Sequence, residues 1–194
     1  MSGFWGFLSA HAGEILSLSL QHGGMVCAAM GLGIVSGIPL GILLTRRPRL
    51  APAVLGAAAA LQTVPSVALL GLLMLLPVIG GIGPRPAVAA LFLYSLLAIV
   101  ENTHSGIRQV DAAVIDSGRG MGMTDSQVLT LIELPQALPL IVAGIRISAV
   151  VCVATATVAS YIGAGGLGDL IFRGVGTMDE VIESRIGGTS SAAP

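Results

Sequence analysis

The stretch "DSGRGMGMTDSQVLTLIELP", residues 116–135, interrupts an unusually apolar sequence with glycines, acids, hydroxyl groups and methionines. It lies between two apolar tracts of a 194-residue chain that is 54% hydrophobic and only 10% charged. A soluble domain has about a quarter charged residues, so this chain has too few polar groups to cover its own surface. We therefore expect the chain to fold in a lipid bilayer, with this polar stretch outside the hydrocarbon.

Four apolar tracts predict the membrane spans of an all-α, polytopic membrane protein. They cover residues 24–44, 51–79, 86–100 and 138–162. A helix of about 20 apolar residues crosses the hydrocarbon core, so the sequence predicts about four full spans. The second tract contains "QTVPS", residues 62–66, and its proline predicts a broken helix.

The remaining sequence divides the chain into three regions. Residues 1–23 contain no Lys or Arg, unlike a signal peptide, and their "FWGF" start predicts an amphipathic helix at the membrane interface. Residues 24–174 form the transmembrane core, which includes a polar loop at residues 101–137. Residues 175–194 form a polar tail that carries four charged side chains and is not expected to cross a bilayer.

The arginines predict the orientation of the chain. All nine cationic side chains are arginines, and three of them follow the first span directly in "TRRPR", residues 45–49. Because cytoplasmic loops are enriched in arginine, this segment is expected in the cytoplasm and the N-terminus outside. Counting spans then places the loop at residues 101–137 in the cytoplasm as well.

This loop is longer than most connections, and long loops are usually functional. "DAAVIDSGRGMGM", residues 111–123, has the spacing of a short helix that ends at a glycine. Such a helix fits a groove on a partner protein, but a helix that only links two spans has the same pattern. The residues alone leave the two interpretations equally open.

The loop resembles the EAA loop of permease subunits of bacterial ATP-binding-cassette (ABC) importers. That pattern is Glu-Ala-Ala, three residues, Gly, nine residues, Ile, one residue and Leu-Pro. Its glycine falls on Gly122 and its acid on Asp116, where the triplet reads Asp-Ser-Gly, and its Ile and Leu-Pro also match. The resemblance implies that the loop couples the chain to an ATPase through these residues: Asp116, Ser117, Gly118, Gly120, Met121, Gly122, Met123, Ile132, Leu134 and Pro135.

Longer phrases resemble the osmoprotectant branch of these permeases, which serves importers of glycine betaine, choline and carnitine. They include "RRPRLAPAVLGAAAALQTVPSVALLGLLM" and "ATATVASYIGAGGLGDLIFRG", and the similarity extends over residues 25–174. Methionine permeases share part of the second phrase, so a related importer for another small solute is the alternative. The family has one more span after "GLGDLIFRG", and this final span is missing from the polar sequence that follows here.

The resemblance implies a type I ABC importer permease fold and a transport function without enzymatic activity. A separate ABC ATPase, an extracytoplasmic substrate-binding protein and a second permease subunit, either a copy or a sister chain, are the implied partners, together with membrane lipids. ATP would be used by the ATPase, because a chain without lysine cannot form the phosphate-binding loop of a nucleotide site. No cofactor, metal or nucleic acid is expected: the net charge is −1, and the two cysteines lie in apolar runs.

Polar side chains within the spans are candidates for the translocation path. Hydrogen bonding between helices explains them equally well. The candidates are Gln62, Thr63, Pro65, Ser66, Tyr94, Thr155, Thr157 and Ser160. Arg146 lies within the last span, where an arginine is expected to reach the interface or to pair with an acid, and Glu101 is the candidate partner. A quaternary ammonium group is normally held in a cage of aromatic rings. This chain has only seven Phe, Tyr and Trp residues, so the tight site should belong to the binding protein.

Two other classes of protein are weighed against the permease. "GLGD", residues 166–169, matches the GxGD pattern of membrane aspartyl proteases. That chemistry needs two carboxylates that share a proton, and the spans contain no second aspartate. A channel or secondary transporter is disfavoured because the sequence shows no inverted repeat.

Overall fold

The computed structural model describes residues 2–77 and 79–177, with side chains from residue 9 onward. The described part consists of helices joined by short connections and contains no strand, as the sequence predicts. Three helical stretches are long and apolar enough to cross a membrane: Ser9–Arg46, Pro84–Arg108 and Asp125–Ile162. A bent pair of shorter helices adds a fourth crossing if it counts as one span. The side chains of the predicted "FWGF" anchors lie outside this description.

The first helix, α1, runs without a break over Ser2–Arg46. Its 45 residues correspond to roughly 68 Å at 1.5 Å per residue, far more than the hydrocarbon core requires. The interfacial helix expected at residues 1–23 is therefore not a separate element but the outer part of α1. The helix continues through Gly23 and Gly24 because Leu18 and Met25, on either side of them, are both buried against the rest of the chain.

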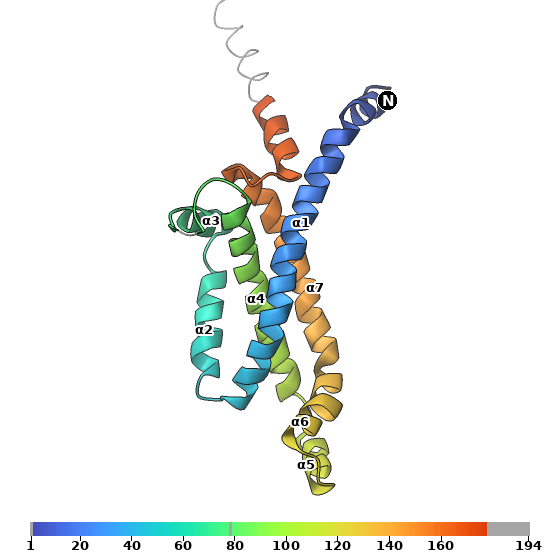
Figure 1. The fold of residues 1–194 in the computed structure, drawn as a ribbon, viewed down its shortest axis with the longest axis vertical. Helices are drawn as coiled ribbons and strands as arrows, with labels where there is room; N and C mark the ends of the chain where they lie inside the picture. The colour runs from blue at the N-terminus through green and yellow to red at the C-terminus, as the bar shows by residue number, and fades with distance from the viewer. Residues whose placement is uncertain (1, 78, 178–194) are drawn as a thin grey trace, which may run out of the picture.

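The second apolar tract forms two short helices, α2 (Ala51–Gln62) and α3 (Ser66–Met74), with an angle of 100° between them. The break at "QTVPS" is confirmed: Pro65 has φ −55° and ψ 136°, an extended conformation that ends the helical ladder. This tract is thus not one straight span. It carries the chain from the end where α1 terminates to the end where the next long helix begins (Figure 1).

The core is a bundle of α1, α4 (Pro84–Arg108) and α7 (Leu134–Ala159). Small residues let these helices approach closely, as in many membrane proteins. A Cβ on Gly144 of α7 would lie 2.6 Å from the Cβ of Asn102 on α4, so no larger residue fits there. Cys152 of α7 lies in the same contact, and its thiol donates to the backbone oxygen of Leu91 at 3.4 Å. This buried position agrees with its interpretation as a small apolar residue.

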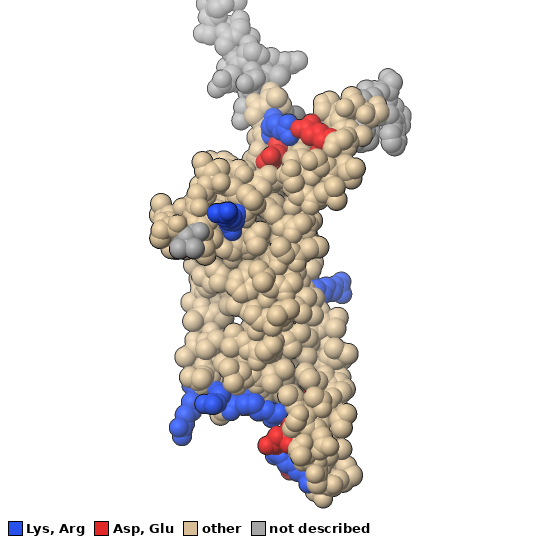
Figure 2. Space-filling view, in the orientation of Figure 1, with Lys and Arg blue, Asp and Glu red and all other residues tan. Residues whose placement is uncertain are grey.

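The two ends of the bundle differ in charge and in content. The loop after α1 and the polar loop between α4 and α7 lie at the same end, and the described N-terminal end of α1 lies at the other (Figure 1). Figure 2 shows arginine side chains gathered along the edge of the first end. The sequence expectation that residues 45–50 and 101–137 share one side agrees with this arrangement, while the identity of that side as the cytoplasm stays a prediction.

The last described helix covers residues 168–177 at the end opposite the polar loop. Glu14 of α1 forms an ion pair at 2.7 Å with Arg173 of this helix, and both side chains are exposed, so the pair adds only weakly to the contact between the two segments. Most of the predicted polar tail, and with it the question of the missing final span, lies outside the described residues.

Candidate functional site

The polar loop folds as two capped helical segments. α5 (Ala112–Gly120) begins at Asp111, whose carboxylate accepts a hydrogen bond from the Ala113 N–H at 2.9 Å. α6 (Asp125–Val128) begins at Thr124 with a capping box: the Thr124 hydroxyl accepts from the Gln127 N–H at 3.3 Å, and the Gln127 side chain accepts from the Thr124 N–H at 2.8 Å. The signal "TDSQ" fits the Ser/Thr-x-x-Glu/Gln pattern of this cap, which sequence reasoning missed.

Gly122 ends α5 in a Schellman motif. The Gly122 N–H donates to the Arg119 oxygen at 2.9 Å, and the Met123 N–H donates to the Gly118 oxygen at 3.1 Å. The motif requires a left-handed residue at this place, and Gly122 has φ +87°. No described atom lies within 4 Å of where its Cβ would be. Within this chain, glycine is therefore needed at position 122 for its backbone conformation and not for a close contact.

The other two glycines of the loop have different surroundings. Gly118 is buried, and a Cβ on it would lie 2.6 Å from Cδ1 of Ile132 and 3.2 Å from the Met123 sulfur. Gly118 thus allows α5 to pack on the returning segment of its own chain, which differs from the expectation of close approach to a partner. Gly120 is exposed, with no described atom within 4 Å of its Cβ position.

The outer face of the loop is open to solvent. Asp116, Ser117, Gly120 and Gly122 are exposed, and Met121 is 73% exposed. Among the residues that the structure describes, the Asp116 carboxylate has no ion pair. The loop thus presents an exposed methionine and an unpaired carboxylate, to which a partner can supply an apolar contact and a cation.

The remaining residues of the coupling pattern follow the turn at Gly122 and lead into α7. Met123, Ile132 and Leu134 are half-buried, and Pro135 is exposed at the second position of α7. The five residues before α7 form a π-helix, η1 (Leu129–Glu133). This segment attaches the loop to the bundle. The exposed residues at positions 116–122 form the solvent-facing side of the loop.

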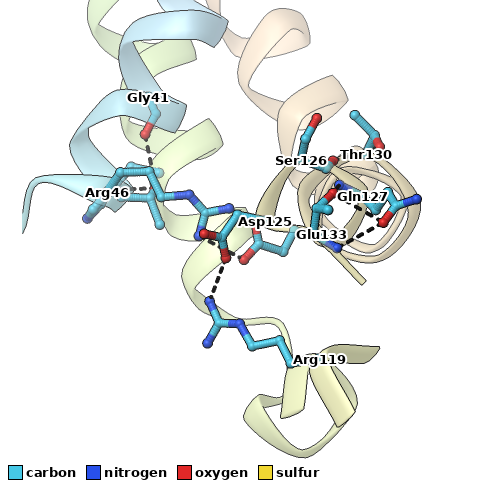
Figure 3. A network of polar contacts seen from close by, with 11 residues as sticks. Gly41, Arg46, Arg119, Asp125, Ser126, Gln127, Thr130 and Glu133 are labelled. Atoms are coloured by element: carbon cyan, nitrogen blue, oxygen red, sulfur yellow. Dashed lines mark hydrogen bonds and ion pairs between the residues drawn. The ribbon is translucent and has the colours of Figure 1, made fainter. Parts of the chain in front are cut away.

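An ion pair that sequence reasoning missed ties this segment to α1. Glu133 has only 3% of its side chain exposed and is held by both terminal nitrogens of Arg46, one of them at 3.1 Å (Figure 3). A two-point arginine–carboxylate pair of this kind is geometrically specific. The sequence signal is Glu133 as the lone charge in "LTLIELP". A second pair in Figure 3, Arg119 to Asp125 at 3.3 Å, is exposed at both ends and contributes about 0–1 kcal/mol.

Two of the predicted path residues share a cavity. Gln62 and Tyr94 line a space of about 290 Å³ together with Ala98, Ile147 and Val151. The Tyr94 hydroxyl donates at 2.8 Å to the backbone oxygen of Val64, in the break between α2 and α3. The Tyr94 hydroxyl thereby gives a hydrogen-bond partner to a backbone carbonyl that the broken helix leaves unpaired. Such a partner is needed where a helix breaks within a membrane.

The other predicted path residues do not line this cavity. Thr63 donates to the Ala60 oxygen at 2.7 Å, beside the break at Pro65 and Ser66. Thr155 and Ser160 are buried in the outer half of α7 and η2 (Ser160–Ile162). Local hydrogen bonds occupy two of the hydroxyls: Thr157 donates to the Val153 oxygen at 3.2 Å, and Ser160 donates to the Gly165 oxygen at 3.0 Å.

Arg146 does not pair with Glu101, which corrects the sequence expectation. Arg146 is exposed, and no ion pair involves it within residues 2–77 and 79–177. The reason is helical geometry. Gly144 and Ser148 of α7 are buried and face α4, to which the Ser148 hydroxyl donates. Because successive residues turn by about 100°, Arg146, midway between them, points away from α4.

An apolar helical bundle with several helices long enough to span a bilayer, and with a capped, exposed polar loop at one end, is typical of an integral membrane protein. Comparison with known families makes this specific. A family model described as binding-protein-dependent transport system inner membrane component matches residues 37–182. The chain belongs to this family of inner-membrane transport components.

Curated relatives are similar over most of the chain. The carnitine transport permease protein OpuCB of Listeria monocytogenes is 48% identical over 169 residues, which are 87% of this chain and 76% of the relative. The osmoprotectant import permease protein OsmW of Salmonella typhimurium is 47% identical over 175 residues, 89% of this chain and 81% of the relative. The choline transport system permease protein OpuBB of Bacillus subtilis is 43% identical over 169 residues, 87% and 76% of the two chains.

Solved structures confirm the fold. The MetNI methionine ABC transporter in an inward-facing conformation aligns with a TM-score of 0.73 at 23% identity, covering 82% of this chain and 79% of that chain. An amino acid ABC transporter with histidines aligns with a TM-score of 0.69 at 18% identity, covering 91% and 81%. The predicted fold of ABC importer permeases is therefore correct.

Proposed function

We propose that this chain is the membrane-spanning permease subunit of an ATP-driven importer for quaternary-amine osmoprotectants, the class that includes glycine betaine, carnitine and choline. The observation that carries the proposal is the 43–48% identity, over 87–89% of the chain, to permeases named for carnitine, choline and osmoprotectants. The methionine transporter shares the fold at only 23% identity, so the likeness to it does not extend to the substrate.

In this proposal the chain transports and does not catalyse. Its polar loop docks on a separate ATPase with the exposed face that carries Asp116 and Met121. ATP is bound and hydrolysed by that ATPase, since a chain without lysine lacks the residue that holds the nucleotide phosphates. A binding protein outside the membrane supplies the tight, aromatic-rich site, and a second permease subunit, a copy or a sister chain, completes the path.

Reconstitution tests this proposal. The chain is purified with an ATPase and a binding protein of the same importer class and placed in lipid vesicles, and uptake of radiolabelled glycine betaine, carnitine, choline and methionine is measured. We expect concentrative uptake of at least one quaternary amine, only with ATP and all components present. Uptake by the chain alone, or uptake of methionine in place of quaternary amines, refutes the proposal.

A further inference from the structure

The seam between α1 and α4 is closed by α2 in the half that lies near the polar loop. There, Leu44 of α1 and Val100 of α4 are almost fully buried in one cluster with Ala51 of α2. Leu40 and Leu96, on the same two long helices, pack against this cluster. α2 therefore fills the space between α1 and α4 at this end of the bundle.

The half of the seam farther from the polar loop is open. α2 ends at Gln62, and α3 turns away from it by 100°. The seam continues there as a shallow groove of about 520 Å³. Its walls come from α1, from the connection between α3 and α4, and from α4, so the groove is not the face of one helix. They include Leu32, Ile79, Arg85, Val88, Ala89 and Phe92.

The groove continues the closed half along the same two helices. Phe92 is about one turn of α4 from Leu96, and Leu32 is about two turns of α1 from Leu40. Leu32 is nevertheless 55% exposed. No described residue thus takes the place of α2 in this half of the seam.

Arg85 places one end of the groove at the membrane boundary. It is the second residue of α4, at the end opposite the polar loop (Figure 1). Residues 86–100, which follow it, carry no charge. From Arg85 to Phe92 is about 10 Å of helix, and one leaflet of the hydrocarbon core is about 15 Å thick. The groove therefore begins where α4 enters the apolar layer and reaches into a single leaflet.

Arg85 has no anionic partner among the described residues. Its side chain is exposed, and none of the ion pairs between described side chains involves it. The other walls of the groove are apolar, so an occupant must bring an anion to Arg85 and an apolar segment to Leu32 and Phe92. A phospholipid has its groups in this order, with phosphate at the boundary and acyl chains below it. Arginine binds phosphate through two parallel hydrogen bonds.

A helix of another protein meets these requirements only with an acid at the level of Arg85. Acidic side chains close to the hydrocarbon are costly and rare. Every phospholipid of the leaflet carries a phosphate at this level, whatever its neighbours. The charge of Arg85 and its depth therefore favour a lipid as the occupant of the groove.

We propose that the open half of the α1–α4 seam binds one phospholipid, with its phosphate on Arg85 and an acyl chain along Leu32 and Phe92. The lipid takes the place that α2 has in the other half. It also contacts Ile79, so it holds the connection between α3 and α4 against the bundle. The groove shares no wall residue with the cavity at Tyr94. The inference goes beyond the proposed function, because it does not depend on the transported solute.

Native mass spectrometry of the full chain in detergent tests this site with phosphatidylglycerol as the probe. We expect the unaltered chain to retain a tightly bound lipid. Arg85→Gln should weaken its apparent affinity about tenfold, the effect of losing a charged hydrogen bond. Arg85→Lys, which keeps the charge, should retain most of the binding.

Arg146→Gln is the matched control for the loss of charge. Arg146 is also an exposed arginine without an ion pair among the described residues, but it lies outside the groove. Its replacement should change the affinity for phosphatidylglycerol less than about twofold. No retained lipid, unchanged affinity in Arg85→Gln, or an equal loss in Arg146→Gln overturns the proposal.

Two partial ligands test the two contacts separately. Diacylglycerol lacks the phosphate, and the deacylated head group, glycerophosphoglycerol, lacks the acyl chains. Diacylglycerol should bind about tenfold more weakly than phosphatidylglycerol, and the head group alone should not displace the bound lipid. Equal binding of diacylglycerol shows that Arg85 does not hold a phosphate. Displacement by an equal concentration of the head group shows a site for free phosphate compounds. Either result overturns the proposal.

Photo-cross-linking in the membrane identifies the occupant directly. Leu32→benzoylphenylalanine should join to phospholipid, both in the membrane and after detergent has removed the bulk lipid. Val35→benzoylphenylalanine is the matched control, because Val35 is 75% exposed on α1 but is not a wall of the groove. It should lose its lipid product in detergent. No lipid product at position 32 in detergent, equal products at both positions, or a product with another protein chain at position 32 overturns the proposal.

Discussion

Replacing Gly122 tests the backbone conformation of the loop separately from its side-chain contacts. The position has φ +87°, and no described atom lies within 4 Å of where a Cβ would be. A larger residue at position 122 is therefore destabilised only by the strain of the left-handed backbone conformation, and not by a steric clash within this chain. For alanine this costs roughly 1–2 kcal/mol. Asparagine tolerates the left-handed region better, and valine tolerates it worse because its branched Cβ meets the backbone.

The Schellman hydrogen bonds decide whether the turn survives this strain. The two bonds, donated by the N–H groups of Gly122 and Met123, together contribute about 1–3 kcal/mol at 0.5–1.5 kcal/mol each. Gly122→Asn should therefore keep the turn, Gly122→Ala should leave it marginal, and Gly122→Val should open it. A partner that binds only the closed turn loses affinity in proportion to the closed fraction, about tenfold per 1.4 kcal/mol.

The assay measures co-purification of the ATPase and ATP-driven uptake for each variant. Both should fall in the order Asn, Ala, Val, with the variant protein still present in the membrane. Gly56→Ala is the matched control: Gly56 lies inside α2 with no described atom near its Cβ position, so alanine should leave both measurements unchanged. If Gly122→Val binds the ATPase and transports as well as the unaltered chain, the loop is only a connector and this reasoning is wrong.

Three further predictions concern the same end of the molecule. Gly118→Ala should destabilise the loop by about 1–3 kcal/mol through overpacking against Cδ1 of Ile132. Ile132→Val removes that atom, so the double variant should be more stable than the sum of the single effects, and strict additivity in thermal denaturation would disprove the contact. Arg46→Gln should cost about 3 kcal/mol or more because it leaves the buried Glu133 carboxylate unpaired. Glu133→Gln should cost only about 1–2 kcal/mol, since Arg46 is 37% exposed and can turn to water; the reverse order of melting temperatures contradicts this. Asp116→Asn should change ATPase affinity by about 0–1 kcal/mol, as expected for an exposed pair, and loss of complex formation would show a stronger role.

Patterns that repeat locally predicted most of the fold. Runs of apolar residues located the spans, Pro65 located the broken helix, and the spacing of Gly122, Ile132 and Pro135 located the polar loop. These features depend on residues close together in the sequence. The sequence did not predict that residues 1–23 continue into the first span. Gly23 and Gly24 suggest the end of a helix, and only the burial of the residues on both sides of them shows that the helix continues.

Features that depend on distant residues were not predicted. Arg46 and Glu133 are 87 positions apart, and no period or motif connects them. The direction of Arg146 follows from which face of α7 packs on α4, and that face is set by small residues on both helices. Thr157 and Ser160 show the same limit, because a polar residue in a span has the same sequence signal whether it lines a path or donates to a nearby backbone oxygen.

The continuity of α1 has a mechanical consequence. Near one end, Arg46 of α1 is paired with Glu133, in the segment that follows the polar loop, and near the other end Glu14 is paired with Arg173 of the helix over residues 168–177. An unbroken helix resists compression and shear along its length. A displacement of the loop that preserves the Arg46–Glu133 pair moves this end of α1 with it, and Pro39, inside the helix, is a place where α1 can bend. α1 thereby links the two ends of the bundle through one continuous helix that has a side-chain ion pair near each end.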